Sequence, residues 1–465
     1  MIVAVLFALS LSATADAVPS AKPGPTPSSE RRTGAAFTKM TKKLFVPSFS
    51  RQTKLPCGVC HNGFPQLTAF GRLFKLNGYT MTGLATINGQ GDSIRLNLEL
   101  SPIAPLSVMA IISHTRTATS IPGTINGTSE FPQQLSFFAA TQISPKMGAF
   151  TQFTYAAQDK ALGIDNVDVR YASHVMVHDK DLLYGVTLHN NPTVQDVWNT
   201  LPAWSYPFNS AGTAPHPVAS TLIDGGLAQT VLGVGTYALY NNLLYGEVSG
   251  YTSAPQGAAA PADSTSTNTP RGLSPYWRLA LQRSFGDTYV MVGSFGLDAH
   301  VYPGGFSGLT NHYSDLGFDA QVERRTSKGM LIGRASYVKE NQSLTAFHTA
   351  TPAESNLSNS LNAYKANLTY LPSLAHIFTV GLFGTTGSSD ALLYPSESVT
   401  GSANGSPTSR GATLEYSYNP WLNTRFGAQY TLYSRFNGAS SSYDEVSGRN
   451  ARANNTLYLF LWLAY

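Results

Sequence analysis

The feature that most constrains the fold of this chain is a regular alternation of strand-like runs with connections of two different lengths. From Pro105 onward we distinguish sixteen runs of about 9–14 residues, from 106–116 to 454–465, with period-2 alternation in part of each run. Seven short polar or Pro/Gly turns join the runs in pairs, at 144–146, 178–180, 241–242, 286–287, 326–328, 372–373 and 419–420. Longer stretches follow each pair, and the longest are 190–226 and 252–274. This pattern predicts an all-β fold, a transmembrane antiparallel β-barrel of sixteen strands over residues 105–465, with periplasmic turns and external loops.

The composition favours the same class. Only 12% of the residues are charged, against about 25% in ordinary soluble proteins. Aromatic residues reach 11%, which excludes a disordered chain, and no internal apolar run has the 18 or so residues of a spanning helix. A large soluble all-β protein is the alternative. The five tryptophans are expected either as interfacial anchors or in ordinary packing: Trp198, Trp204, Trp277, Trp421 and Trp462.

The N-terminal residues have the features of an export signal. Residues 2–13 form an apolar run, and Ala15-Asp16-Ala17 fits a small-x-small cleavage site. We therefore predict a signal peptide at 1–17 and a Pro/Ser-rich linker at 18–34. A buried strand or a short anchor is the alternative, and the missing positive n-region is compatible with a start further upstream.

The two cysteines of the chain lie three residues apart, in Cys57-Gly58-Val59-Cys60-His61. This spacing, with the adjacent histidine, is the pattern of covalent c-type haem attachment. It predicts one haem c, bound through Cys57 and Cys60, with His61 as the proximal iron ligand. A disulfide would leave His61 unexplained, a thioredoxin-type pair needs a βαβ context, and a zinc site needs a fourth ligand.

The predicted cytochrome domain spans residues 35–90, and a connector at 91–104 leads to the barrel. Leu67, Phe70 and Phe74 recur at helical spacing, and Asn77-Gly78 is a helix stop, so we expect a helix that covers the haem. Met81 is the candidate distal ligand, with ordinary packing, a barrel histidine or an open iron site as alternatives. So small a domain cannot cover a haem comfortably, and something else is expected to enclose it.

Charge is distributed unevenly along the chain. Residues 31–90 contain nine Lys/Arg and no Asp or Glu, whereas residues 91–465 carry a net charge of −4. A basic segment can bind nucleic acid, but export favours a basic module docked in an acidic shell, so we expect no nucleic-acid partner. The segment should lie inside the barrel or at its periplasmic mouth, and Lys54, Arg72 and Lys75 should raise the haem potential.

Histidines and acids also fall in or beside the long loops. Each is a candidate for transient metal binding but is better explained as a solvated polar residue. They are His189, His216, His300, His312, Asp196, Asp224, Asp298 and Asp315.

One stretch resembles a known family. It contains Arg51-Gln52-Thr53, the motif Cys57–His61, Phe64-Pro65-Gln66-Leu67, Phe70-Gly71, Phe74-Lys75 and Asn77-Gly78-Tyr79. The chain is similar here, and in its layout, to the fused outer-membrane monohaem cytochrome–porins of iron-oxidising bacteria. The resemblance implies a haem plug inside the barrel, attached at Cys57 and Cys60 and ligated by His61. It also implies electron transfer from an extracellular donor, commonly Fe(II), to a periplasmic c-type cytochrome.

These features leave three functions open. The first is an outer-membrane electron conduit, with a possible Fe(II):cytochrome c oxidoreductase activity. The second is a porin or channel whose haem module is a structural plug or a redox sensor. The third, a soluble partner of a multihaem chain, is disfavoured by the single motif and by the barrel.

Overall fold

The fold was analysed in a computed structural model, which describes residues 47–84, 87–88, 99–158, 160–254 and 266–465. The predicted signal peptide (1–17), the linker (18–34), the first part of the cytochrome domain and most of the connector (91–104) lie outside these residues. No helix among the described residues is long and apolar enough to cross a membrane.

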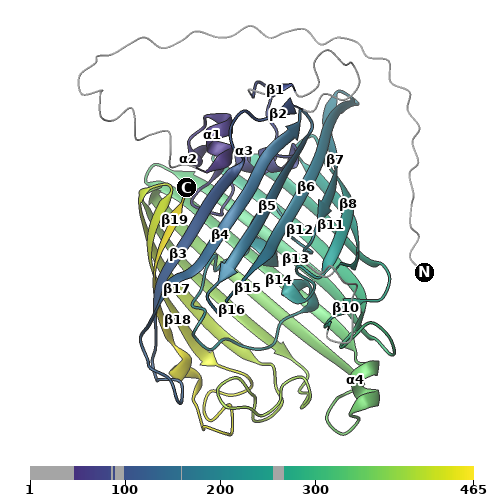
Figure 1. Cartoon of the computed structure of the whole chain (residues 1–465), viewed down its shortest axis with the longest axis vertical. Coiled ribbons are helices and arrows are strands. Elements are labelled where there is room, and N and C mark those ends of the chain that lie inside the picture. Colours follow the sequence, from purple (N-terminus) through teal and green to yellow (C-terminus); the bar gives the residue numbers. More distant parts are fainter. Residues whose placement is uncertain (1–46, 85–86, 89–98, 159, 255–265) are drawn as a thin grey trace. The chain divides into compact units, whose positions relative to one another are not determined.

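Sixteen long strands form one closed antiparallel barrel (Figure 1). Each strand pairs with its sequence neighbours, β9 pairs with β11 past the two-residue strand β10 (Thr269–Pro270), and β19 pairs with β3 to close the ring. The first seven barrel strands are β3 (Leu106–Thr117), β4 (Thr128–Ser144), β5 (Met147–Ala156), β6 (Ala161–Val177), β7 (Lys180–His189), β8 (Val231–Tyr240) and β9 (Leu244–Ser253). The other nine are β11 (Ser274–Phe285), β12 (Thr288–Tyr302), β13 (Asn311–Thr326), β14 (Gly329–Ser343), β15 (Ser358–Ser373), β16 (His376–Gly387), β17 (Ser409–Trp421), β18 (Thr424–Arg435) and β19 (Thr456–Ala464). The predicted strand number is confirmed.

Five of the seven short turns lie where the sequence predicts them. The other two are displaced towards the C-terminus, by two residues to 374–375 and by three residues to 422–423. In both hairpins the register shifts just before the turn, between Tyr370 and Ser373 and between Tyr418 and Trp421. Pro372 and Pro420 lie in these irregular strand ends. Because the regular pattern of interstrand hydrogen bonds is already broken there, the missing backbone N–H of proline removes none of them, and the strand continues past the proline.

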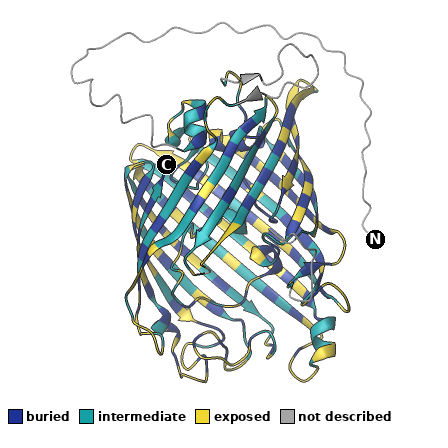
Figure 2. Cartoon of the chain, in the orientation of Figure 1, coloured by how far each residue is buried: buried dark blue, intermediate teal, exposed yellow. Residues whose placement is uncertain are grey.

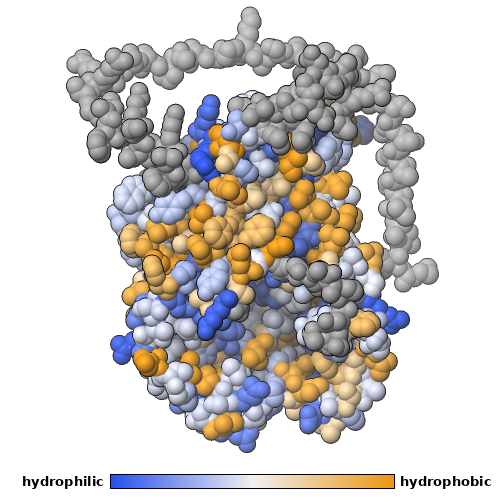
Figure 3. Space-filling view, viewed as in Figure 1, coloured by the Kyte–Doolittle hydropathy of each residue, from blue (hydrophilic) through white to orange (hydrophobic). Residues whose placement is uncertain are grey.

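The outer wall is apolar and the inner wall is polar, the reverse of a soluble barrel. In β11, for example, Leu279 and Leu281 point outward and are more than half exposed, whereas Arg278 and Gln282 point inward and are buried. Figure 2 shows this alternation as stripes of buried and exposed residues along the strands. In Figure 3 apolar residues gather on the wall towards the end that carries the helices. An apolar wall that faces outward is typical of a barrel in lipid, so the barrel is of the outer-membrane type.

Three short helices lie at the end of the barrel where the turns are short (Figure 1). They are α1 (Ser48–Thr53), α2 (Cys57–Cys60) and α3 (Ala69–Leu76). The Thr68 side chain accepts a hydrogen bond from the Gly71 N–H and caps α3, and Gly78 has a φ of +69°, which fits its expected role as a helix stop. Beyond them, β1 (Ile87–Asn88) and β2 (Glu99–Leu100) form a separate two-stranded sheet. We call residues 47–84 the helical segment.

The sequence pattern predicted that the longest connection between barrel strands lies outside the barrel. This prediction is wrong. Residues 190–230, between β7 and β8, include the short helices η1 (Pro202–Trp204) and η2 (Leu222–Gly226), and residues 191–201 are all buried. These residues contact inward-pointing side chains of β11 to β15, so the loop, which we call the inner loop, folds back into the lumen. Two other short helices, α4 (Thr345–Ala350) and η3 (Ala451–Asn454), lie in the connections after β14 and before β19.

The tryptophans divide between the two faces of the wall. Trp277 and Trp421 point outward, with exposed fractions of 36% and 68%, and fit the expected anchors. Trp198, Trp204 and Trp462 instead lie inside, in the inner loop and on the lumen side of β19, so the anchor prediction is wrong for these three.

Candidate functional site

A cavity of about 530 Å³ lies between the helical segment, the inner loop and the barrel wall. This volume falls within the range of about 300–1,000 Å³ that is common for ligand pockets. Its walls are mainly apolar and aromatic, and they include Phe64, Leu67, Phe74, Met109, Ile111, Phe138, Phe150, Trp204, Phe208 and Trp462. Cys57, Cys60 and His61 line the same cavity. The structure therefore brings all three residues of the predicted attachment motif to one apolar pocket.

The motif is a single helical turn followed by an extended residue. The His61 N–H donates to the Cys57 carbonyl at 2.9 Å, and His61 then bridges to Leu67 in extended conformation. Both cysteines are free thiols, and burial raises the pKa of Cys57 and raises that of Cys60 to about 11. The two thiols are therefore protonated at neutral pH.

The His61 ring is half-buried and packs against Phe64, with 4.1 Å between ring centroids. Burial lowers the pKa of His61 to about 4, so the imidazole is neutral at pH 7, as an iron ligand must be. Its Nδ1 atom is buried and has no hydrogen-bond partner. An orphaned ring nitrogen is costly in a protein interior, and it fits a site that is completed by a bound group.

The helix α3 lies directly on the attachment motif. A Cβ atom at Gly71 would stand 2.2 Å from the Cys60 carbonyl oxygen, so only glycine allows this approach. Phe74 of α3 lines the cavity, and so does Leu67, which precedes the N-cap of α3 and is not part of the helix as predicted. Phe70 does not, since it points away and is 38% exposed. The apolar stripe is thus split between the cavity and the surface.

Charged and polar side chains dock the helical segment on the inner wall. Arg72 forms a buried ion pair with Glu323 of β13, with 2.5 Å between Nη1 and Oε1. The Tyr79 hydroxyl donates to Asp168 of β6 at 2.6 Å. Two basic residues of this segment, Arg72 and Lys75, thus lie beside lumen acids, as the uneven charge of the sequence predicts; residues 31–46, 85–86 and 89–90 of the basic segment lie outside the described residues.

Lys75 has an unusual environment for an amine. Its Nζ atom donates to the carbonyl oxygens of Val194 and Asp196 at 2.7 and 2.9 Å, and it lies 3.9 Å from Asp168. Burial lowers the pKa of Lys75 to about 7, although the negative charge of Asp168 raises this pKa and so offsets part of the effect. A substantial fraction of this amine is therefore neutral at physiological pH.

These partners bear on the expected effect of Lys54, Arg72 and Lys75 on a haem. Lys54 is exposed, Arg72 is paired with a carboxylate, and Lys75 is partly uncharged. Their positive charge is largely compensated or screened, so it gives little physical support for a raised potential. Arg425 of β18 is a further cation that lines the cavity, and its Nη2 donates to the Phe64 carbonyl at 2.9 Å.

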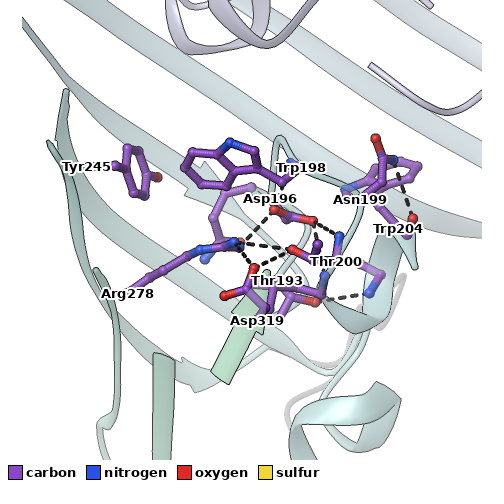
Figure 4. A network of polar contacts seen from close by, with 12 residues as sticks. Thr193, Asp196, Trp198, Asn199, Thr200, Trp204, Tyr245, Arg278 and Asp319 are labelled. Atoms are coloured by element: carbon purple, nitrogen blue, oxygen red, sulfur yellow. Dashed lines mark hydrogen bonds and ion pairs between the residues drawn. The ribbon is translucent and has the colours of Figure 1, made fainter. Parts of the chain in front are cut away.

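A buried polar network ties the inner loop to the wall (Figure 4). Arg278 of β11 bridges Asp196 of the inner loop, at 2.8 Å, and Asp319 of β13, at 2.6 Å. Thr200 donates to Asp319 at 2.5 Å, and the Arg278 guanidinium lies 4.6 Å from the centre of the Trp198 ring. Because Asp196 also accepts from the backbone N–H groups of Trp198, Thr200 and Leu201, the network fixes the loop that forms one wall of the cavity.

The candidate distal ligand Met81 and a second methionine, Met109, differ in position. Met81 follows α3 and does not line the cavity, whereas Met109 of β3 does. Met109 is the only thioether among the lining residues, and His61 the only imidazole. The sequence analysis did not single out Met109, although the inward positions of β3 (107, 109 and 111) were a usable signal.

The histidines and acids of the predicted long loops also separate in space. His189, Asp196 and Asp315 are buried inside the barrel and so are not solvated loop residues. Asp224 pairs with Lys365, and His216 is exposed. Only Asp298, His300 and His312 come together as a metal-ligating group within the described part of the chain.

Comparison with known proteins shows likeness in structure alone. No protein-family model matches the chain, and no curated protein matches it. An anion-selective porin from Comamonas acidovorans aligns with a TM-score of 0.45 and 11% identity, over 77% of this chain and 98% of that one. OmpF from Salmonella typhi aligns with a TM-score of 0.41 and 15% identity, over 79% of this chain and 98% of that one. The trimer form of OmpT from Vibrio cholerae aligns with a TM-score of 0.42 and 11% identity, over 77% of this chain and 98% of that one. We draw no conclusion about function from these likenesses.

Proposed function

We propose that this protein is an outer-membrane electron-transfer protein that carries one covalently attached haem c within the short-turn end of its barrel. The observation that carries the proposal is that Cys57, Cys60 and His61 line one apolar cavity. The buried Nδ1 atom of His61, which has no hydrogen-bond partner, supports it. The resemblance to fused cytochrome–porins points the same way.

In this proposal the residues of the chain have separate tasks. Cys57 and Cys60 attach the haem, His61 ligates its iron as a neutral imidazole, and the aromatic wall keeps water away. When bound, the haem supplies a one-electron Fe(III)/Fe(II) couple. The distal ligand is Met109 or Met81, and the cavity favours Met109 because Met81 does not line it.

The position of the cavity suggests the direction of transfer. In outer-membrane barrels the short turns face the periplasm, so a periplasmic c-type cytochrome would approach the cavity from the nearer side. An extracellular donor, Fe(II) in the first instance, would have the longer path from the long-loop end. The apolar band of such a barrel is about 25 Å tall, too far for useful tunnelling from the rim, so the donor has to enter the lumen.

The attachment is tested first. Purified wild type should show a haem-stained band on a denaturing gel and a c-type pyridine-haemochrome spectrum, and Cys57→Ala and Cys60→Ala should each reduce the stained haem. Wild type from a host with c-type maturation that loses all haem under denaturing extraction would refute the proposal. Reduction of the loaded protein by aqueous Fe(II), without a mediator, then tests the donor.

A porin or channel is the second candidate, favoured by the closed sixteen-stranded barrel and its polar inner wall. In that case the helical segment is a plug or a sensor. Bilayer conductance of the wild type separates the two. The conduit needs no open pore and predicts little ion current, whereas a channel has to pass ions around the inner loop and the helical segment. A steady porin-like current together with a haem that Fe(II) does not reduce would favour the channel.

A further inference from the structure

Three metal-ligating side chains meet on the outer wall, far from the haem motif in sequence. Asp298 and His300 of β12 and His312 of β13 each offer a ligand atom, and these three atoms lie within 4.8 Å of one another. His312 Nε2 is 2.9 Å from an Asp298 carboxylate oxygen. The rings of His300 and His312 are stacked, with 4.2 Å between centroids and 12° between planes.

The sheet itself places these residues together. His300 and His312 are directly opposite each other in the register of β12 and β13, and Asp298 lies two residues away on the same face of β12. The His300 carbonyl accepts from the Arg271 N–H, on the side away from β13. The two histidines therefore form a non-hydrogen-bonded pair, the kind in which opposite side chains are closest.

The group lies at the long-loop end of the barrel, where residues 303–310 connect the two strands. On the same face of β13 the apolar wall begins at Leu316 and Phe318, which are 44% and 53% exposed. Asp298 and His312 are themselves partly exposed, at 48% and 35%. The three side chains are thus just beyond the apolar band, open to the external medium and not sealed in lipid.

We propose that Asp298, His300 and His312 form a binding site for a divalent transition-metal cation at the external rim of the barrel. Two imidazoles and one carboxylate, with open positions, suit Zn²⁺, Cu²⁺ or Fe²⁺ and are a poor set for Mg²⁺ or Ca²⁺. Ligand bonds of about 2.1 Å at tetrahedral angles place ligand atoms about 3.4 Å apart. Rotation of the partly exposed side chains can bring the three ligand atoms to that spacing, opening the 2.9 Å contact between His312 and Asp298 and closing the wider ones, without movement of the strands.

One neighbouring charge opposes cation binding. Arg271 lies within electrostatic range of His300 and is the positive group on that side. An exposed like charge of this kind weakens binding by about 1.4- to 5-fold. This is less than the loss of a ligand, so Arg271 lowers the affinity of the site without abolishing binding.

The experiment uses the full-length protein in detergent, with equimolar Cu²⁺ and electron paramagnetic resonance. Wild type should bind Cu²⁺ with hyperfine coupling to two imidazole nitrogens, and excess Zn²⁺ should displace it. His300→Ala should keep one nitrogen and lose at least about tenfold in affinity, and Asp298→Asn should also weaken binding. Arg271→Gln should strengthen it. These results do not depend on the haem.

The matched control is His114→Ala, which removes a histidine of β3 whose Nδ1 is hydrogen-bonded to Ser129. Its Cu²⁺ spectrum and affinity should equal those of the wild type. Heat-modifiable gel mobility verifies that each variant folds. Should His300→Ala and Asp298→Asn both bind Cu²⁺ within twofold of the wild type, the three residues are only a hydrogen-bonded surface group and the proposal is overturned.

Discussion

The buried pair of Arg72 and Glu323 provides the sharpest test of how the helical segment is docked. Both side chains are less than 10% exposed, and the Arg72 guanidinium also lies 4.3 Å from the centre of the Tyr289 ring. In the variant Arg72→Met, Glu323 stays buried without its partner. Breaking a buried ion pair from one side costs about 3–5 kcal/mol, because the remaining charge has lost its water and gained nothing in return.

This cost should appear in the amide exchange of α3. An isolated helix of eight residues is not stable in water, so its amides exchange when the segment leaves the wall. A loss of 3–5 kcal/mol corresponds to exchange that is roughly 150- to 5,000-fold faster for peptides that contain α3. Hydrogen–deuterium exchange with mass spectrometry measures this directly. Lys54→Met, which removes an exposed cation of the same segment, should exchange like the wild type.

The double variant Arg72→Met/Glu323→Leu decides whether the ion pair is the cause. With both charges replaced by apolar groups, most of the protection should return, because such replacements of a buried pair are often neutral or stabilising. Exchange of α3 in Arg72→Met within about threefold of the wild type would refute the reasoning. So would a double variant that exchanges faster than either single one.

Three further outcomes follow from the cavity. Gly71→Ala should lower the haem content of the purified protein, since its Cβ would meet the backbone of α2 at 2.2 Å, whereas Gly304→Ala, with no atom within 4 Å, should not. Because the pKa of Lys75 is lowered to about 7 in the docked state from its ordinary 10.5, the undocked segment binds more protons between these values. Protection of α3, corrected for intrinsic exchange, should therefore rise from pH 7 to pH 9, and Lys75→Met should remove that rise. Finally, Met109→Ala should abolish the long-wavelength absorption band of a methionine-ligated ferric haem, and Met81→Ala should preserve it. The reverse result would assign Met81 as the distal ligand. Both variants should still stain for haem, which keeps this test separate from the attachment test.

The sequence by itself determined the features that depend on near neighbours in the chain. Strand number followed from period-2 runs and the alternation of turn lengths, because side chains of a strand in a barrel wall must alternate between two faces. The motif Cys57–His61 is a single turn, and the cap and stop of α3 at Thr68 and Gly78 are equally local. Such features need no information about distant residues.

Tertiary structure decided what surrounds that motif. The inner loop looks like any other long polar connection, and its return into the lumen rests on Arg278 and Asp319, residues 80 to 120 positions away. Met109 reaches the cavity because β3 closes the barrel against β19, at the opposite end of the chain. The cluster of Asp298 and two histidines likewise depends on the register of β12 and β13. A one-residue slip would turn one histidine inward, and only the paired strands fix that register.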